Sequence, residues 1–360
     1  MERDDLDTPA LLVDVQLLRK NIGDMADFAR SLGRKLRPHV KTHKVPEIAW
    51  MQLEAGANGI CVQKLGEAEV MAEAGISDIF VSNEVVGKHK MSRLMRLAEK
   101  VKISVAVDDK ENIQELGKSS KEAGVEIGVY VDVDCGMHRT GAAPEKAWLL
   151  AEQVIKTDGL HLVGVMGYEG HAGSPILREE RHGLIDAAVK ATLQAVKLMK
   201  HKGIEPDEVS VGSSATVKIS GRYDGVTELQ PGMYVFNDWY LVEREAATRE
   251  TCALHVLTTV MSKTSPDRCV VDAGSKSFRL DMGRYPVCVT LDGVEIYKFS
   301  EEHGWARLSV EASERVKLGD MLEFIPYHVC PCVNQFDLMY GLEGERVVRK
   351  WEIKARGKVT

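Results

Sequence analysis

The stretch KISVAVDDKENIQELGKSSKEAGVEIGVYVDVD, residues 102–134, contains two β-rich runs with an amphipathic segment between them. The runs at 102–107 and 126–134 have the β-branched content and the length of buried strands. The segment at 109–124 has helical periodicity and ends in Ala-Gly, which favours helix termination. A strand, a helix and a second strand in this order predict parallel pairing of the two strands.

The same alternation extends over residues 30–240, with helical patterns such as 63–75 and 178–203 between the runs. Eight β-rich runs occur there, at 35–42, 59–62, 78–82, 102–107, 126–134, 162–170, 208–214 and 227–236. Eight strand–helix units predict an α/β fold with a closed (β/α)8 TIM barrel, for which about 200 residues are sufficient. An open sheet of the same strands is the alternative.

The pattern changes after Asp238, where β-rich runs are separated by short turns without helical periodicity. These runs lie at 251–262, 268–274, 286–293, 305–312 and 319–326. They predict a mostly antiparallel β domain. We therefore expect a barrel over residues 1–245 and a C-terminal β domain over residues 246–360. The first run, TPALLVDV at 8–15, either returns to the β domain or packs beneath the barrel.

Bulk composition excludes several classes of protein. The 360-residue chain is 44 % apolar and 28 % charged, as is usual for globular proteins, and its net charge of −7 argues against nucleic-acid binding. No apolar run approaches the roughly 18 residues of a membrane-spanning helix, and the acidic N-terminus does not have the layout of a signal peptide. Seven irregularly spaced cysteines do not form a disulfide framework. We expect a cytoplasmic protein without nucleic-acid or membrane partners.

The active site of a barrel lies at the C-terminal ends of its strands, and the first strand ends in RPHVKTHK, residues 37–44. His39, Lys41 and His43 alternate, so on a strand they would share one face. A lysine in the barrel mouth would be desolvated and could form a Schiff base. Lys44 competes with Lys41 for this role, and a surface lysine is the ordinary alternative for either.

The fifth and sixth strands also end in groups that could bind a ligand. DVDCGMHRTG at 132–141 contains His138 and Arg139, and GYEGHAG at 167–173 contains Tyr168 and His171. Taken singly, each histidine is more typical of a structural residue than of a catalytic one.

Small and polar residues follow the last two barrel strands. VGSSAT at 211–216 can offer backbone N–H groups and hydroxyls to an anion, and QPGMY at 230–234 includes Gly232, which allows close backbone approach. Two such loops together with a lysine on the first strand indicate a phosphorylated cofactor that the lysine attacks. Pyridoxal 5'-phosphate (PLP) meets both requirements.

A candidate metal pair lies in PYHVCPCVNQFD, residues 326–337. His328 and Cys330 are two residues apart, so in an extended segment both would point to one side. An imidazole and a thiolate suit Zn²⁺ and leave coordination positions for water or substrate. Cys332 could be a further ligand, although Pro331 bends the chain. Pairs at this spacing also arise by chance.

These motifs together resemble the fold-type III PLP enzymes, in the branch that holds D-threonine aldolase, D-threo-3-hydroxyaspartate dehydratase and eukaryotic-type D-serine dehydratase. The resemblance covers nearly the whole chain, and it rests on TPALLVD, RPHVKTHK, DVDCGMHRTG, GYEGHAG, VGSSAT, QPGMYVFND and HVCPCVN in this order. It implies an alanine-racemase-like barrel with a C-terminal β domain, and a homodimer.

The resemblance also implies roles for individual residues. Lys41 corresponds to the Schiff-base lysine, Arg139 to an arginine near the phenolic oxygen and Tyr168 to a residue near the pyridine ring, while Lys44 falls on the opposite strand face. The phosphate-contacting segments correspond to Gly212, Ser213, Ser214, Thr216, Gly232 and Met233. His328 and Cys330 correspond to the pair that binds a divalent metal, Zn²⁺ or else Mn²⁺, Mg²⁺ or Co²⁺. His43 could reach a metal-bound hydroxyl or merely line the entrance.

The activity implied is that of a PLP- and metal-dependent lyase acting on D-3-hydroxy amino acids, with retro-aldol cleavage of D-threonine-type substrates ranked first. Dehydration of D-serine or D-threo-3-hydroxyaspartate is the close alternative, since the His-x-Cys pair is associated with dehydratases. A racemase would need a second base such as Tyr285 or Tyr297, and would have no use for the metal pair. A non-catalytic PLP carrier and a zinc-only hydrolase are more distant alternatives.

Overall fold

The computed structural model describes residues 1–360, and the chain forms two compact units. The β unit comprises Met1–Gly23, Thr42–Glu47 and Met233–Gly357, and the barrel unit comprises Asp24–Lys41, Ile48–Gly232 and Lys358–Thr360. The β unit therefore contains the first residues of the chain as well as the C-terminal segment from Met233 onward.

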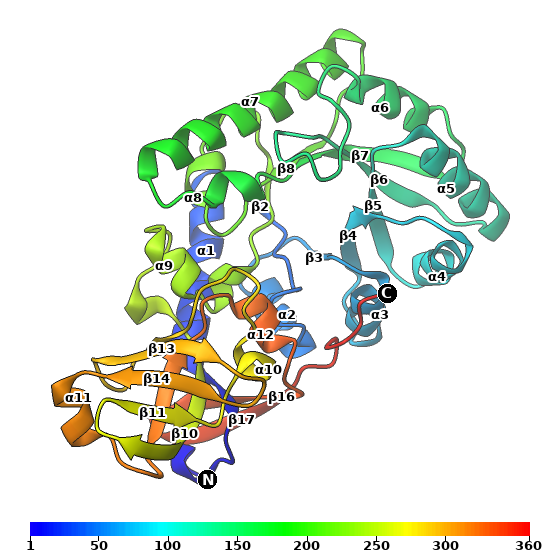
Figure 1. Ribbon diagram of the computed structural model, residues 1–360. Helices are drawn as coiled ribbons and strands as arrows, with labels where there is room; N and C mark the ends of the chain where they lie inside the picture. The colour runs from blue at the N-terminus through cyan, green and yellow to red at the C-terminus, as the bar shows by residue number, and fades with distance from the viewer. The chain divides into compact units, whose positions relative to one another are not determined.

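The barrel unit is built on an eight-stranded sheet in which every neighbouring pair is parallel (Figure 1). Its strands are β2 (Lys35–Leu36), β9 (Glu228–Leu229), β8 (Glu208–Val211), β7 (Leu160–Gly167), β6 (Ile127–Asp132), β5 (Lys102–Val107), β4 (Asp78–Glu84) and β3 (Ile60–Val62), in spatial order. A parallel bridge between His39 and Cys61 joins the two ends, and Val40 N–H donates to Cys61 O at 2.9 Å. The sheet is thus closed, which confirms the TIM barrel over the open alternative.

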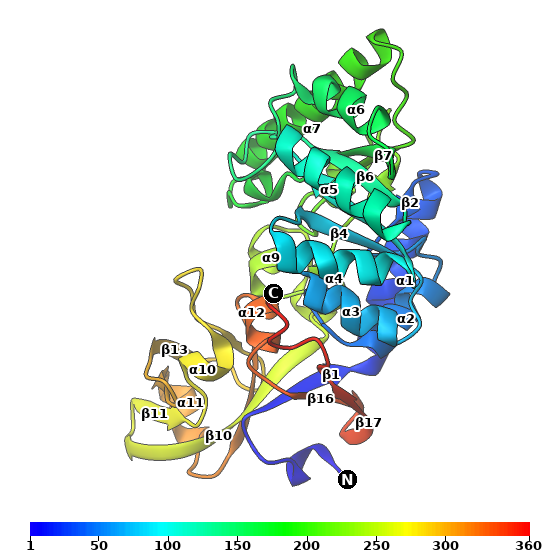
Figure 2. The same cartoon turned by 90° about the vertical axis from the view of Figure 1, so that its right-hand side faces the viewer.

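The helices that alternate with the strands follow from local sequence. In α5 (Lys110–Ala123), the Asp109 side chain caps the first turn by accepting from the N–H groups of Glu111 and Asn112, and Gly124 ends the helix with φ of 68°. The others are α1 (Val15–Ser31), α2 (Pro46–Glu54), α3 (Leu65–Glu73), α4 (Lys88–Ala98), α6 (Ala147–Ile155), α7 (Arg178–His201) and α8 (Val217–Ser220). Helices α3 to α6 lie side by side across the outside of the sheet (Figure 2). None of the helices has both the length and the apolar character needed to cross a membrane.

The inside of the barrel is filled by one buried side chain from each of five successive strands. These residues are Cys61, Phe80, Ala106, Tyr130 and Met166. The rings of Phe80 and Tyr130 stack with their centroids 4.1 Å apart. The barrel is therefore a packed core, and a ligand can be held only at its rim.

The β unit contains a closed six-stranded antiparallel barrel. Its strands are β10 (Leu254–Ser265), β11 (Arg268–Val271), β14 (Gly304–Leu308), β13 (Val294–Phe299), β12 (Val287–Cys288) and β15 (Met321–Ile325), and β15 pairs with β10 again. Strand β1 (Ala10–Asp14) pairs antiparallel with β10 and parallel with β16 (Leu338–Glu343), which pairs with β17 (Arg346–Glu352). The mostly antiparallel domain is confirmed, and of the two alternatives for the first run, return to this domain is the one observed.

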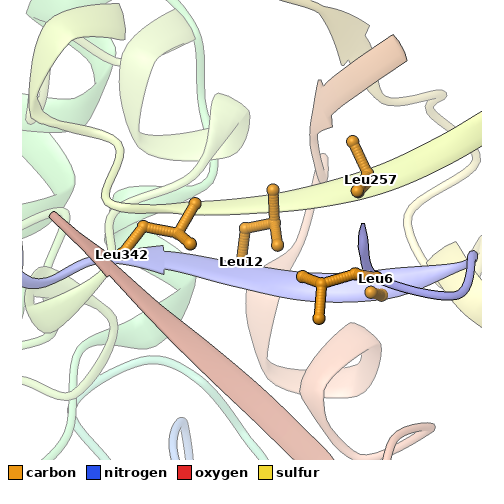
Figure 3. Packing of buried hydrophobic residues seen from close by; sticks show 5 residues of the cluster. Leu6, Leu12, Leu257 and Leu342 are labelled. Atoms are coloured by element: carbon orange, nitrogen blue, oxygen red, sulfur yellow. The ribbon is translucent and has the colours of Figure 1, made fainter. Parts of the chain in front are cut away.

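Short helices connect these strands, contrary to the expectation of turns alone. They are α9 (Trp239–Glu243), α10 (Ser275–Phe278), α11 (Val310–Arg315) and α12 (Val329–Val333), with 3-10 turns at Arg3–Asp5, Met233–Val235 and Arg249–Thr251. Around β1, a cluster of leucines holds the sheet together: Leu12 of β1 packs with Leu257 and Leu342, and with Leu6 (Figure 3).

Candidate active site

Lys41 lies in a turn that His39 supports. Strand β2 ends at Leu36 and only a bridge at His39 follows, so the expected strand face shared by His39, Lys41 and His43 does not form. Instead, the Lys41 N–H donates to Nδ1 of the buried His39 at 3.3 Å. Nε2 of His39 lies 3.2 Å from both Gln63 Oε1 and Ser82 Oγ. Because Nδ1 accepts, Nε2 carries the proton. With this tautomer the His39 ring is held by Gln63 and Ser82 and in turn holds the Lys41 backbone.

Tyr168, directly after β7, is approached by two cations. Lys41 Nζ lies 5.5 Å from the centre of the Tyr168 ring, and the Arg139 guanidinium carbon lies 5.2 Å from it. These distances fall within the range of cation–π attraction. The structure thus brings together three residues that the sequence places on separate strand ends, and it leaves Lys41 half-buried at the rim.

The loop after β8 is held by Glu169, a residue that the sequence analysis did not select. The buried Glu169 carboxylate accepts from Gly212 N at 3.0 Å and from Thr216 Oγ1 at 2.7 Å. Ser213 N in turn donates to Thr216 Oγ1 at 2.9 Å. Thr216 therefore shapes the loop through these bonds. Gly212 has a φ of 102°, so the loop requires glycine there.

The loop after β9 is joined to the Lys41 turn. His39 N–H donates to Pro231 O at 2.9 Å, so the residue before Gly232 is fixed to the residue that supports Lys41. Gly232 is half-buried. Met233 is half-buried as well and begins the 3-10 turn Met233–Val235. Ser213 and Ser214 are buried in the neighbouring loop.

Two carboxyl groups at strand ends lie close together near Arg139. Glu84 ends β4 and Asp132 ends β6, and their side chains are hydrogen-bonded. Burial, the largest cause, and the neighbouring Glu84 carboxyl together raise the pKa of Asp132 to about 7, against the opposing hydrogen bond from Thr140. Burial also raises the pKa of Glu84. The pair was not predicted, because the two residues are distant in sequence and Glu84 lies outside every motif that was selected.

His171 lies in the 3-10 turn Gly170–Gly173 that follows Tyr168, and its Nδ1 is buried without a hydrogen-bond partner. Burial lowers the pKa of His171, which favours the neutral ring. A neutral imidazole with an unused nitrogen can accept a proton. His138, in contrast, is exposed and its Nδ1 pairs with Asp134 Oδ2 at 2.7 Å, which fixes its own loop.

In the β unit, His328 and Cys330 are brought together by a helix start rather than by an extended strand. His328 occupies the N-cap position of α12, and Cys330 is the second residue of that helix. The two side chains are nevertheless hydrogen-bonded. Nδ1 of His328 lies 2.7 Å from Asp281 Oδ2. Burial alone would lower the pKa of His328, but the hydrogen bonds to Asp281 and Cys330 raise it to about 10.

Two further contacts define this pair. The buried Thr42 hydroxyl lies 3.2 Å from Cys330 Sγ. Cys332 is also buried, and its thiol donates to Ser277 O at 3.2 Å while burial raises its pKa strongly. A thiol used in this way does not serve as a third ligand. No group of three or more His, Cys, Asp or Glu side chains is arranged to hold a metal ion.

His43 and Lys44, at the end of the RPHVKTHK motif, belong to the β unit and form hydrogen bonds within it. Lys44 is buried with φ of 57°, and its Nζ donates to Asn334 Oδ1 at 2.9 Å. His43 is fully buried, and its Nδ1 accepts from Val45 N at 3.1 Å. This contact stabilises the turn, and a catalytic role for His43 stays a prediction.

Comparisons with known proteins agree with this architecture. The model of the alanine racemase N-terminal domain matches residues 13–238, and that of a serine dehydratase domain matches residues 253–342. A D-threonine aldolase of Arthrobacter sp is 36% identical over 355 residues, which is 98% of this chain and 93% of that protein. A 3-hydroxy-D-aspartate aldolase of Paracoccus denitrificans is 33% identical, with 99% and 94% covered.

A solved structure extends the likeness to three dimensions. The crystal structure of D-threonine aldolase from Filomicrobium marinum superimposes with a TM-score of 0.93 at 35% identity, covering 99% of this chain and 98% of that one. The similarity therefore spans both units and the whole length of the relatives. The chain belongs to the D-threonine aldolase and D-serine dehydratase family of PLP-dependent lyases.

Proposed function

We propose that this protein cleaves D-3-hydroxy amino acids of the D-threonine type into glycine and an aldehyde, with PLP and a divalent metal ion as cofactors. The observation that carries the proposal is the cluster at the barrel rim, where Lys41 and Arg139 both approach the Tyr168 ring. The D-configuration of the substrate is supported by the names of the relatives, a D-threonine aldolase and a 3-hydroxy-D-aspartate aldolase.

The residues at the rim fit PLP. Lys41 would hold it covalently, Tyr168 and Arg139 would hold its ring, and the backbone of the loop with Gly212, Ser213 and Ser214 would hold its phosphate, with Gly232 and Met233 beside it. A side chain at Gly212 would place its Cβ 3.0 Å from Val217 Cγ2, so the narrow loop requires a glycine. PLP supplies an electron sink for the bond that breaks at Cα.

The donor set in the β unit fits a divalent ion. His328 would bind it through Nε2, because Nδ1 is used by Asp281, and Cys330 would bind it through Sγ. Imidazole and thiolate suit Zn²⁺, which supplies Lewis-acid activation of the substrate hydroxyl. Two protein ligands leave positions for that hydroxyl and for water.

Cleavage of Cα–Cβ requires that the β-hydroxyl proton leaves and that Cα gains a proton. We assign the first step to His171, three residues after Tyr168, whose neutral ring has a buried, unpartnered Nδ1. Lys41 is the group at the rim that can return a proton to Cα. The electron pair of the broken bond stays with the glycine fragment, and the hydroxyl carbon leaves as the aldehyde.

Dehydration is the second candidate, and one observation favours it. The second ligand is Cys330 rather than a carboxylate, which the resemblance associates with dehydratases. In that reaction Lys41 would remove the Cα proton and hydroxide would depart from Cβ, followed by loss of ammonia. A racemase is less consistent with the site, because Tyr285 packs edge-on against Phe299 and Tyr297 against Trp305.

One experiment separates these reactions. Zn²⁺-loaded and Mn²⁺-loaded enzyme with PLP is incubated with D-threonine, D-serine and 3-hydroxy-D-aspartate, and glycine, aldehyde, ammonia and keto acid are measured. Glycine and acetaldehyde from D-threonine in equal amounts are expected. Ammonia and keto acid as the only products would overturn the aldolase assignment. Lys41→Ala should lack the yellow, borohydride-reducible cofactor, whereas Lys88→Ala, on the exposed start of α4, should retain it.

A further inference from the structure

Asp281 is the one carboxylate bonded to the ring of His328. Its Oδ2 accepts from His328 Nδ1–H at 2.7 Å, and both side chains are largely shielded, at 34% and 19% exposure. Because His328 has only two ring nitrogens, its hydrogen bond with Cys330 uses Nε2. Nε2 therefore points toward the Cys330 sulfur, while Nδ1, on the other side of the ring, is hydrogen-bonded to Asp281.

We propose that Asp281 is a positioning residue for the metal site: it fixes the His328 tautomer that presents the Nε2 lone pair, so that Nε2 and Cys330 Sγ meet at one cation such as Zn²⁺. This inference rests on the proposed function. A carboxylate on the far nitrogen of a ligating histidine orients the ring and makes the ligating nitrogen more basic. Asp281 acts through His328 and does not bind the ion itself.

The fold explains how Asp281 reaches His328 from 47 positions earlier in the sequence. Asp281 follows α10, and Arg279, the residue after the end of this helix, has a left-handed φ of 61° that turns the chain. The Cys332 thiol of α12 donates to Ser277 O of α10 at 3.2 Å. The two short helices are thus joined, and Cys332, which could have been a further ligand, has a supporting role at this junction.

The neighbouring carboxylate Asp238 does not compete for this role. Its Oδ2 accepts from Val329 N at 3.0 Å and its Oδ1 from Leu241 N at 3.0 Å, so it holds the first turns of α12 and α9. Asp238 therefore supports the backbone next to His328, and of the two carboxylates only Asp281 is hydrogen-bonded to the imidazole.

Metal affinity tests the inference without turnover. The full-length protein, holding PLP and stripped of metal, is titrated with Co²⁺ and with Zn²⁺ by calorimetry and by the absorbance of Co²⁺. Asp281→Ala should bind both ions about 10- to 100-fold more weakly. The metal affinity of Asp281→Asn should lie between those of wild type and Asp281→Ala, because the amide oxygen of asparagine still accepts from Nδ1–H. The control is Asp337→Ala, which removes an aspartate of the same unit that pairs with Arg356 and is 78% exposed.

A second readout is independent of ion affinity. In metal-free protein labelled with ¹⁵N at histidine and held above about pH 10, where the His328 ring is neutral, the wild type should report Nδ1–H and Asp281→Ala should show mixed tautomers. Wild-type affinity together with an unchanged His328 tautomer in Asp281→Ala would overturn the inference and leave the proposed function standing. A wild-type protein that binds neither ion would overturn the inference and the metal requirement together.

Discussion

The backbone N–H of Lys41 donates to Nδ1 of His39, two residues earlier, across 3.3 Å. The same imidazole reaches Gln63 and Ser82 through Nε2, and the His39 N–H donates to Pro231 O. One buried side chain thus connects the Lys41 turn with the loop after β3, with β4 itself and with the loop after β9. The position of the reactive amine depends on a residue that need not contact any ligand.

Replacing His39 should therefore impair turnover more than cofactor retention. His39→Leu removes the acceptor for Lys41 N–H and the link to Gln63, so we expect kcat to fall about 10- to 100-fold through misplacement of the amine. The yellow absorbance of bound PLP and the turnover of D-threonine are measured together. His89→Gln, on the exposed face of α4, is the control and should change neither. Unaltered kcat in His39→Leu would contradict the positioning role.

Glu169 should be needed for the shape of the loop after β8, which is proposed to hold the phosphate of PLP. Glu169→Gln keeps one acceptor oxygen and leaves either Gly212 N–H or the Thr216 hydroxyl unpaired, which should cost about 1–3 kcal/mol in the free energy of unfolding. PLP affinity should fall as well, because the loop loses an anchor. Urea denaturation and PLP titration measure the two effects. Glu122→Gln, exposed on α5, should stay within about 0.5 kcal/mol of wild type.

Sequence reasoning was most successful where local pattern decides structure. Strand β5 occupies residues 102–107 as predicted, and the α5 caps Asp109 and Gly124 lie where the pattern placed the helix ends. Strands β13, β16 and β17 were not predicted, although β13 pairs with the neighbouring β14 and β16 with the neighbouring β17. An extended segment was considered for His328 and Cys330, but Cys330 lies in α12, and Pro331 lies in the first turn of that helix, where its missing N–H costs nothing.

In the candidate site, some residues could be selected from the sequence and others could not. Lys41, Arg139 and Tyr168 could be selected because each lies in a motif at a strand end, and the structure brings them together. Glu169 and Asp281 were missed. Glu169 lies in a glycine-rich motif from which only Tyr168 and His171 were selected. Asp281 is brought to His328 only by the junction of α10 and α12. No periodicity or spacing encodes a contact of that kind.

The Glu84–Asp132 pair should make stability depend on pH. The unfolded chain releases the Asp132 proton near its ordinary pKa of 3.8, whereas the folded protein retains it until the pKa of about 7. Unfolding therefore releases a proton between about pH 4 and pH 7, and stability falls as pH rises through this window. Glu84, Asp108 and Arg139 are the charged groups that face Asp132 or its partner.

Asp132→Asn removes this proton and keeps the acceptor for Thr140. Between pH 5 and pH 8, wild type should lose about 2 kcal/mol of unfolding free energy more than the variant, since one pKa unit corresponds to about 1.4 kcal/mol. Urea denaturation at the two pH values measures the difference. Equal losses in the two proteins would show that Asp132 is already ionised at pH 5.

Thr42 should tune the metal site through Cys330. Its hydroxyl lies 3.2 Å from Cys330 Sγ and, once that sulfur is a thiolate, can only donate to it, which helps to hold the negative charge. Thr42→Val keeps the shape and removes the donor, so Zn²⁺ affinity should fall about tenfold. The control is Thr258→Val, which removes another buried hydroxyl bond of the same unit, from Thr258 Oγ1 to Leu322 O at 3.0 Å. Both variants should lose about 1 kcal/mol of stability, but only Thr42→Val should bind Zn²⁺ more weakly. A similar loss of Zn²⁺ affinity in both would indicate a general loosening of the β unit rather than a role for Thr42 at Cys330.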